Sequence, residues 1–172
     1  LNRRGLTEGL EAHFRSRNAG PAHLFVVDID HFKRINDTWG HEVGDTVLCH
    51  VADVLRETAR KGDLACRVGG EEFVIVCRDT DGQGAMRLAE RVRATIEHHA
   101  VPIGGGRDPI QCTATIGVSH GFASAHGFDH AMQQADAALY LGKAAGRNRV
   151  VQSADTDSKP VATKADGSPA MA

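Results

Sequence analysis

Arg67-Val68-Gly69-Gly70-Glu71-Glu72-Phe73-Val74-Ile75-Val76 is the stretch that decides the fold of this chain. Strand-forming residues flank a Gly-Gly pair on both sides, a pattern that predicts a β-hairpin with a two-residue turn. Both central residues of a type I′ turn need φ > 0, which glycine adopts without a Cβ clash. In that register Val68 faces Glu71. Arg67 faces Glu72, and we expect a charge pair between them across the hairpin.

The two carboxylates after the glycines should project to opposite faces, because side chains alternate along a strand. Glu71 then has no charge partner across the hairpin, and the bare turn beside it lets a ligand approach the backbone of Gly69 and Gly70. These residues alone fit two interpretations equally. One is a metal or substrate site, and the other is a solvated hairpin end.

Length and composition predict one soluble domain with an ordinary core, because 24% of the 172 residues are charged and 41% are hydrophobic. A net charge of −2 provides no broad positive surface for nucleic acid or for an anionic membrane. We therefore expect neither partner for the domain, and any phosphate binding must rest on a few placed residues. No apolar run reaches the ~18 residues of a spanning helix.

The cysteines are scattered and form no C-x-x-C pair, so we expect reduced, buried thiols and a cytoplasmic location. They are Cys49, Cys66, Cys77 and Cys112. The chain starts at Leu1 without an initiator Met, and we expect it to be a fragment of a protein with an N-terminal sensory domain.

Apolar periodicity predicts helices alternating with strands, which indicates an α/β fold with one mixed sheet flanked by helices. The expected helices cover residues 6–16, 32–40 (a short helix and loop), 43–60, 85–96 and 128–146. The expected strands cover residues 23–30, the central hairpin, 111–119 and 149–151. Residues 1–152 form the predicted domain. Residues 153–172, rich in Ser, Ala, Asp, Lys and Pro, are expected to be a disordered tail.

Acidic side chains stand at the ends of two predicted strands. Asp28 and Asp30 close the first strand and share a face if it stays regular, and Glu71 begins another. Mg²⁺ prefers one or two protein carboxylates and completes its shell with water and phosphate oxygens. Lys143 and Arg147, four residues apart, would share a face at the end of the last helix, with a solvated helix terminus as the alternative.

Three segments at consistent spacing resemble the GGDEF family of diguanylate cyclases: residues 28–37 (DIDHFKRIND), 40–45 (GHEVGD) and 69–73 (GGEEF). Residues 138–148 resemble the last helix of that family and its exit, and residues 1–4 resemble the end of its leader motif. The resemblance implies a fold like that of nucleotidyl cyclases and polymerase palm domains. It also implies the condensation of two GTP molecules into cyclic di-GMP, with release of two pyrophosphates, by a homodimer.

The resemblance implies catalytic and metal-binding roles for individual residues. Asp28 and Glu71 match the metal-binding carboxylates, and the backbone carbonyl of Ile29 matches a further ligand. The expected cofactor is Mg²⁺, with Mn²⁺ as a substitute. Glu71 also matches the proposed general base, and Lys33 matches a cation near the charge that develops during transfer. Asp30 matches no ligand, and a bend at Ile29 would re-aim it.

The resemblance also implies substrate contacts. Asn36 and Asp45 match the residues that hydrogen-bond guanine, and His41 lies near the nucleoside. Lys143 and Arg147 match contacts to the triphosphate. A carboxylate that accepts from N1 and the exocyclic amine of guanine rejects adenine, which lacks that pair of donors.

A second set of residues resembles the family's inhibitory R-x-x-D site for its own product. Arg60 and Asp63 precede the glycines, and Arg91 on the following helix matches a second arginine. Composition alone favours a surface ion pair of little energetic weight.

Two other functions remain as alternatives: a catalytically silent receptor for GTP or cyclic di-GMP, and a cyclase for mixed purine nucleotides. Asp45 argues against the latter, because such enzymes have a small residue there.

Overall fold

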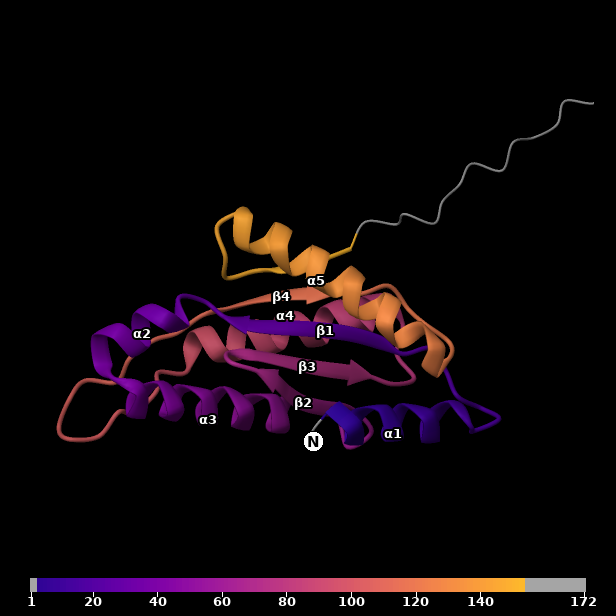
Figure 1. Cartoon of the computed structure of the whole chain (residues 1–172), viewed down its shortest axis with the longest axis horizontal. Coiled ribbons are helices and arrows are strands. Elements are labelled where there is room, and N and C mark those ends of the chain that lie inside the picture. The colour runs from indigo at the N-terminus through magenta and orange to yellow at the C-terminus, as the bar shows by residue number, and fades with distance from the viewer. Residues whose placement is uncertain (1–2, 154–172) are drawn as a thin grey trace, which may run out of the picture.

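The computed structural model describes residues 3–153, which form one α/β domain (Figure 1). Its helices are α1 (Arg3–Phe14), α2 (Phe32–Trp39), α3 (His41–Thr58), α4 (Gly82–His98) and α5 (Phe128–Ala144), with a 3₁₀ turn η1 (Ala125–Gly127) before α5. Its strands are β1 (His23–Ile29), β2 (Leu64–Gly69), β3 (Glu72–Cys77), β4 (Ala114–Val118) and β5 (Val150–Gln152). The expected tail lies outside the described residues from 154 onward, as do residues 1–2 of the leader-like segment.

The strands form one mixed sheet in the order β2-β3-β1-β4-β5, which confirms the predicted fold class. Three of the four strand pairings are antiparallel, and β5 runs parallel to β4. Strand β1 is central and buried along its whole length, as its continuous apolar run predicts. The end of β1, the β2–β3 turn and α2 lie at the same end of the sheet (Figure 1).

Apolar side chains from alternate strand positions form a separate core on each side of the sheet. Phe25, Val27 and Ile29 of β1 pack with α3 and α4. Leu24 and Val26 pack on the other side with α1 and α5. Cys112, Ala114, Ile116 and Val118 belong to the first core, and Ala131, Ala135 and Leu139 of α5 belong to the second. The period-two pattern therefore decides which helices cover each face.

Helix α5 approaches the sheet closely because β4 carries a glycine beneath it. A Cβ at Gly117 would collide with the backbone of Ala135 and Leu139. A Cβ at Gly142, near the end of α5, would lie 2.7 Å from Cγ2 of Thr115 on β4. The helix therefore brings its last turn directly over the end of the sheet where β1 finishes.

The predicted hairpin exists, but the predicted register is wrong. Arg67 pairs with Phe73 and Gly69 pairs with Glu72, so Val68 is an extra residue on β2. Of the two glycines, Gly70 has the positive φ, 44°. The predicted pair of Arg67 with Glu72 is replaced by hydrogen bonds from the Arg67 guanidinium to the carbonyl of Gly70, at 2.9 and 2.7 Å.

Two helix ends also differ from the expected positions. Helix α3 ends at Thr58, with Arg56 as the cation of its last turn, so Arg60 lies in the following loop. Helix α5 ends at Ala144, so Arg147 lies beyond it with φ 63°. The four-residue spacing of Lys143 and Arg147 therefore does not place them on one helical face. Among the helices of residues 3–153, none combines the length and the apolar character that crossing a membrane requires.

Candidate active site

The candidate site lies where β1 ends beside the β2–β3 turn. Asp28 on β1 is opposite Glu72 on β3 and Thr115 on β4. The next residue, Ile29, donates its backbone N–H to the carbonyl oxygen of Glu71 at 3.4 Å. The sheet therefore brings together the two segments that the sequence predicts to hold a metal ion.

Asp28 and Lys143 form the central ion pair of this site. Nζ of Lys143 lies 2.7 Å from Oδ2 of Asp28, whose side chain is only 7% exposed. Burial raises the pKa of Asp28, and the Lys143 ammonium opposes that rise. The charges of Glu71 and Asp30 raise the pKa of Asp28 further, which shows that negative charge is concentrated here.

The acidic residues and the backbone at this point fit a divalent cation. Carboxylate and carbonyl oxygens are the ligands that Mg²⁺ prefers, and it needs only one or two protein carboxylates. Within residues 3–153 no group of three or more His, Cys, Asp or Glu side chains is arranged to hold a metal ion. Asp28, Glu71 and the carbonyl of Ile29 thus suit an ion that takes its other ligands from water and a bound phosphate.

The sequence interpretation missed two acids on the α5 side of the sheet. Glu72 and Asp136 line a hollow of about 280 Å³ together with Lys143 and Tyr140. Burial raises the pKa of Glu72, and the charge of Asp28 adds to that rise. Asp136 and Lys143 are seven residues apart on α5, a spacing that places both on one helical face and could have revealed the cluster.

The residues predicted to bind guanine lie where α2 meets α3. The side chain of Asn36 on α2 points at Gly44 of α3. A Cβ at Gly44 would collide with the Oδ1 atom of Asn36. That Oδ1 atom is buried and has no hydrogen-bond partner within the described residues. Asp45 on the first turns of α3 is exposed, as are His41 and Lys33. The absence of a Cβ at Gly44 therefore gives the amide of Asn36 its place beside α3.

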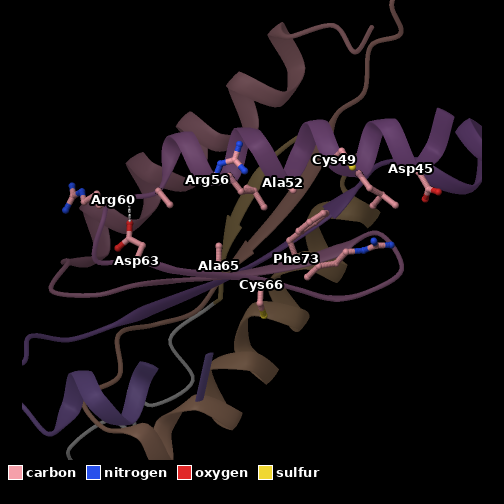
Figure 2. A pocket seen from close by; sticks show the side chains of 13 residues that line it. Asp45, Cys49, Ala52, Arg56, Arg60, Asp63, Ala65, Cys66 and Phe73 are labelled. Carbon is pink, nitrogen blue, oxygen red and sulfur yellow. Dashed lines mark hydrogen bonds between the residues drawn. The ribbon is translucent and has the colours of Figure 1, made fainter. Parts of the chain in front are cut away.

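A groove of about 770 Å³ runs between α3 and the β2–β3 hairpin (Figure 2). Asp45 lies at one end of the groove, and Arg60 and Asp63 lie at the other. Leu48 and Phe73 provide apolar surface in the groove. The groove thus combines an apolar wall with a carboxylate, as a nucleobase site requires.

The predicted product-binding residues meet at the end of α3. The carboxylate of Asp63 accepts the backbone N–H of Arg60 at 2.8 Å, which Figure 2 shows as a dashed line. Arg91 on α4 donates from Nη2 to the carbonyl of Thr58 at 2.8 Å. The structure therefore brings Arg60, Asp63 and Arg91 to one corner of the domain.

Comparison with known proteins assigns the chain to a family. The sequence profile described as "Diguanylate cyclase, GGDEF domain" matches residues 1–149. This chain belongs to the GGDEF domain family. The predicted family is thereby confirmed, and the pentapeptide of this GGDEF domain is Gly69-Gly70-Glu71-Glu72-Phe73.

Similar proteins include a curated relative and two solved structures. Response regulator PleD of Caulobacter vibrioides is 40% identical over 152 residues, which are 87% of this chain and 34% of PleD. The active GGEEF domain of a Vibrio cholerae diguanylate cyclase is 34% identical with a TM-score of 0.77, covering 90% of this chain and 98% of that one. The GGDEF domain of DgcB from Caulobacter crescentus, solved in complex with c-di-GMP, is 32% identical with a TM-score of 0.77, covering 88% and 90%.

Asp30, directly after β1 of the GGDEF domain, has hydrogen-bond partners that the sequence did not reveal. Asp30 lies on the same side of the sheet as Asp28, and its buried carboxylate accepts hydrogen bonds from Thr113, Thr115 and the backbone of Asn148. The hydrogen bond from Thr115 fits the alternation that places the two acids on one face. Hydrogen bonds to three groups distinguish the role of Asp30 from that of Asp28, which pairs with Lys143.

Proposed function

We propose that this GGDEF domain is a diguanylate cyclase, which condenses two GTP molecules into cyclic di-GMP and releases two pyrophosphates. The observation that carries the proposal is the junction of β1 with the hairpin. There the ammonium of Lys143 lies 2.7 Å from Asp28, and the backbone N–H of the next residue, Ile29, donates to the carbonyl of Glu71 at 3.4 Å. Carboxylates next to a cation suit phosphoryl transfer.

In the proposed reaction the 3′-hydroxyl of each GTP attacks the α-phosphorus of the other. A new O–P bond forms, the bond between the α-phosphorus and the bridging oxygen breaks, and pyrophosphate leaves with the electron pair. Each chain provides one groove for one GTP, so two chains must face each other as a homodimer. Catalysis then consists of positioning and charge stabilisation, without a covalent intermediate on the protein.

The charged side chains have distinct proposed roles in that step. Lys33, Lys143 and Arg147 offset the negative charge of the triphosphate, and Lys33 lies near the charge that develops on the transferred group. Glu71 receives the proton of the attacking hydroxyl. Asp28, Glu71 and the carbonyl of Ile29 would hold Mg²⁺ or Mn²⁺, which lowers the pKa of a bound hydroxyl and neutralises phosphate charge.

Guanine selection is assigned to the α2–α3 end of the groove. The carboxylate of Asp45 accepts from N1–H and the exocyclic amine of guanine, and Asn36 supplies a second hydrogen-bonding group. The buried Oδ1 of Asn36, which has no partner within residues 3–153, supports this assignment because such an atom is stabilised by a ligand donor. His41, at the start of α3, lies next to the nucleoside.

The far end of the groove is assigned to the product. Arg60, Asp63 and Arg91 would bind the guanines and phosphates of cyclic di-GMP and reduce turnover as product accumulates. Their common location at the end of α3 supports this role. GTP is a cytosolic substrate, so we place the domain in the cytoplasm as part of a longer protein.

Incubation of the full chain with GTP and Mg²⁺, followed by chromatography of the products, tests the proposal. We expect cyclic di-GMP and pyrophosphate in a 1:2 ratio, with a rate that rises more steeply than linearly with protein concentration. Glu71→Gln should lower the rate by about 10²-fold or more. Glu57→Gln, on the exposed face of α3, is the matched control. Tight binding of cyclic di-GMP without turnover at any protein concentration would instead identify a silent receptor.

A further inference from the structure

The turn after α5 has a backbone conformation that side chains rarely adopt. Gly146, Arg147 and Asn148 have φ values of 111°, 63° and 45°. Positive φ is ordinary for glycine but unfavourable for arginine, and asparagine tolerates it better than most residues. Two consecutive non-glycine residues with positive φ persist only where surrounding contacts hold them.

The inner contact of this turn is the carboxylate of Asp30. Its Oδ2 atom accepts the backbone N–H of Asn148 at 3.0 Å and the hydroxyl of Thr113 at 2.7 Å. Its Oδ1 atom accepts the hydroxyl of Thr115 at 2.6 Å. Asp30 is only 4% exposed, so these bonds are shielded from water and fix the backbone at Asn148 against β1 and β4.

The outer contact joins the side chain of Asn148 to α4. Its Nδ2 atom donates to Oε1 of Glu97 at 2.7 Å, and its Oδ1 atom accepts from Nη1 of Arg93 at 2.7 Å. Nη1 of Arg93 also donates to Oε2 of Glu97 at 2.6 Å, which closes a three-residue ring of hydrogen bonds. The Arg93 side chain is 13% exposed and that of Glu97 is 35% exposed, so the ring is shielded from solvent at Arg93 and open to it at Glu97.

We propose that Asp30, Asn148, Glu97 and Arg93 form a latch that positions Arg147 on the pyrophosphate portion of a bound nucleoside triphosphate. The inference rests on the proposed function, because it deepens the role of Arg147 at that site. Helix α5 ends at Ala144 and cannot orient Arg147 by itself. The latch fixes Asn148, and the backbone N–H of Arg147 donates to the carbonyl of Gly142 at 3.0 Å. The backbone of Arg147 is thereby held against the last turn of α5, which also carries Lys143, the cation that contacts Asp28.

The four latch residues are positioning residues for Arg147. The variants below separate that role from a contribution to the stability of the fold. Asn148→Gly keeps a backbone that tolerates positive φ and keeps the N–H that Asp30 accepts, but it removes both contacts to α4. Glu97→Ala removes the same outer contact from the other side, and Glu97→Gln retains one acceptor. Glu90→Ala is the matched control, because Glu90 also binds Arg93 without touching Asn148.

Binding to the full chain is measured by calorimetry with two non-reacting probes, guanosine α,β-methylene-triphosphate and GMP, in Mg²⁺ buffer. GMP lacks the pyrophosphate portion that Arg147 is proposed to contact. Asn148→Gly and Glu97→Ala should weaken binding of the triphosphate probe on the order of tenfold, the loss of one charge-assisted contact. The affinity of these variants for GMP should stay unchanged. Glu97→Gln should lose less affinity for the triphosphate probe than Glu97→Ala, and Glu90→Ala should bind that probe as tightly as the wild type.

A double variant determines whether the latch works through Arg147. Arg147→Ala/Asn148→Gly should bind the triphosphate probe no more weakly than Arg147→Ala alone, because the latch has nothing left to position. Additive losses, or equal losses for the two probes, would overturn the latch while leaving the proposed function intact. A wild-type chain that binds the triphosphate probe no better than GMP would overturn the proposed triphosphate site, and the latch with it.

Discussion

Nζ of Lys143 lies 2.7 Å from Oδ2 of Asp28, so the last turn of α5 neutralises the acid that stands near the end of β1. The acid is buried, whereas the lysine side chain is 35% exposed. Asp28 therefore depends on this partner more than the lysine does, since an uncompensated buried carboxylate is costly. A phosphate or a cation entering the site would compete for the two members of this pair.

The first prediction concerns the stability of that pair. Lys143→Met should lower the free energy of unfolding at pH 7.5 by about 1–3 kcal/mol, below the value for a fully buried pair because solvent reaches Lys143. Urea denaturation followed by circular dichroism measures the change. Lys61→Met, in the exposed loop after α3, is the control and should shift it by less than about 0.5 kcal/mol. Equal shifts would mean that the ion pair contributes nothing.

Guanine selection can be tested with a base analogue. ITP lacks the exocyclic amine, so the wild type should bind it more weakly than GTP. Asp45→Ala should weaken GTP binding by about 10–100-fold and ITP binding much less, because the Asp45 carboxylate is proposed to accept from the exocyclic amine that ITP lacks. Affinities are compared by competition against a fluorescent GTP analogue. A variant that still prefers GTP over ITP to the wild-type extent would assign selection to other residues.

Product inhibition should depend on Arg60. Arg60→Ala should abolish calorimetric binding of cyclic di-GMP at the end of α3 and remove inhibition, while the initial rate per dimer persists. Arg56→Ala provides the control, because Arg56 lines the same groove but pairs with Asp53 at 2.8 Å. Retained product binding in the Arg60 variant, or its loss in both variants, would contradict the assignment.

Cys49 provides a chemical probe of the groove. It is exposed on the groove wall, whereas the other three cysteines are buried, and burial raises the pKa of Cys112 to about 11. A maleimide should therefore modify one thiol per native chain, and α,β-methylene-GTP should slow that modification several-fold. Mass spectrometry identifies the site, and Cys49→Ser should leave the native chain unlabelled. If the GTP analogue does not slow the modification of Cys49, the nucleotide binds away from this wall.

His23 should make stability depend on pH. Burial lowers the pKa of His23, the nearby charge of His120 lowers it further, and Asp81 and a Thr80 backbone bond oppose the shift. Below the ordinary pKa of about 6.5 the unfolded chain binds a proton that the folded chain resists, so stability falls as the pH drops from 7.5 toward 5.5. His23→Leu should reduce that slope in thermal melts. An identical slope in wild type and variant would exclude His23 as its source.

Sequence periodicity predicted most of the fold because each face of the sheet packs its own apolar side chains against the helices that cover it. Its errors lie where geometry is set by contacts distant in sequence. The extra residue at Val68 and the early end of α5 depend on how β2 meets β3 and on the turn held by Asp30. The site residues came from motif resemblance, whereas the ring of Asn148, Glu97 and Arg93 joins segments about fifty residues apart and leaves no local pattern.

Val68 has a consequence for how this hairpin tolerates length changes. Because Arg67 pairs with Phe73 and Gly69 pairs with Glu72, removing this single residue would join the two flanking pairs into a regular ladder and leave Leu64 and Cys66 on the α1 side. A deletion between Leu64 and Arg67 would instead shift the preceding residues by one position and move the Arg60–Asp63 loop by about 3.3 Å along the strand. One surplus amino acid thus makes the hairpin tolerant of shortening at Val68, whereas shortening elsewhere in β2 should disturb the interior and the distant loop together.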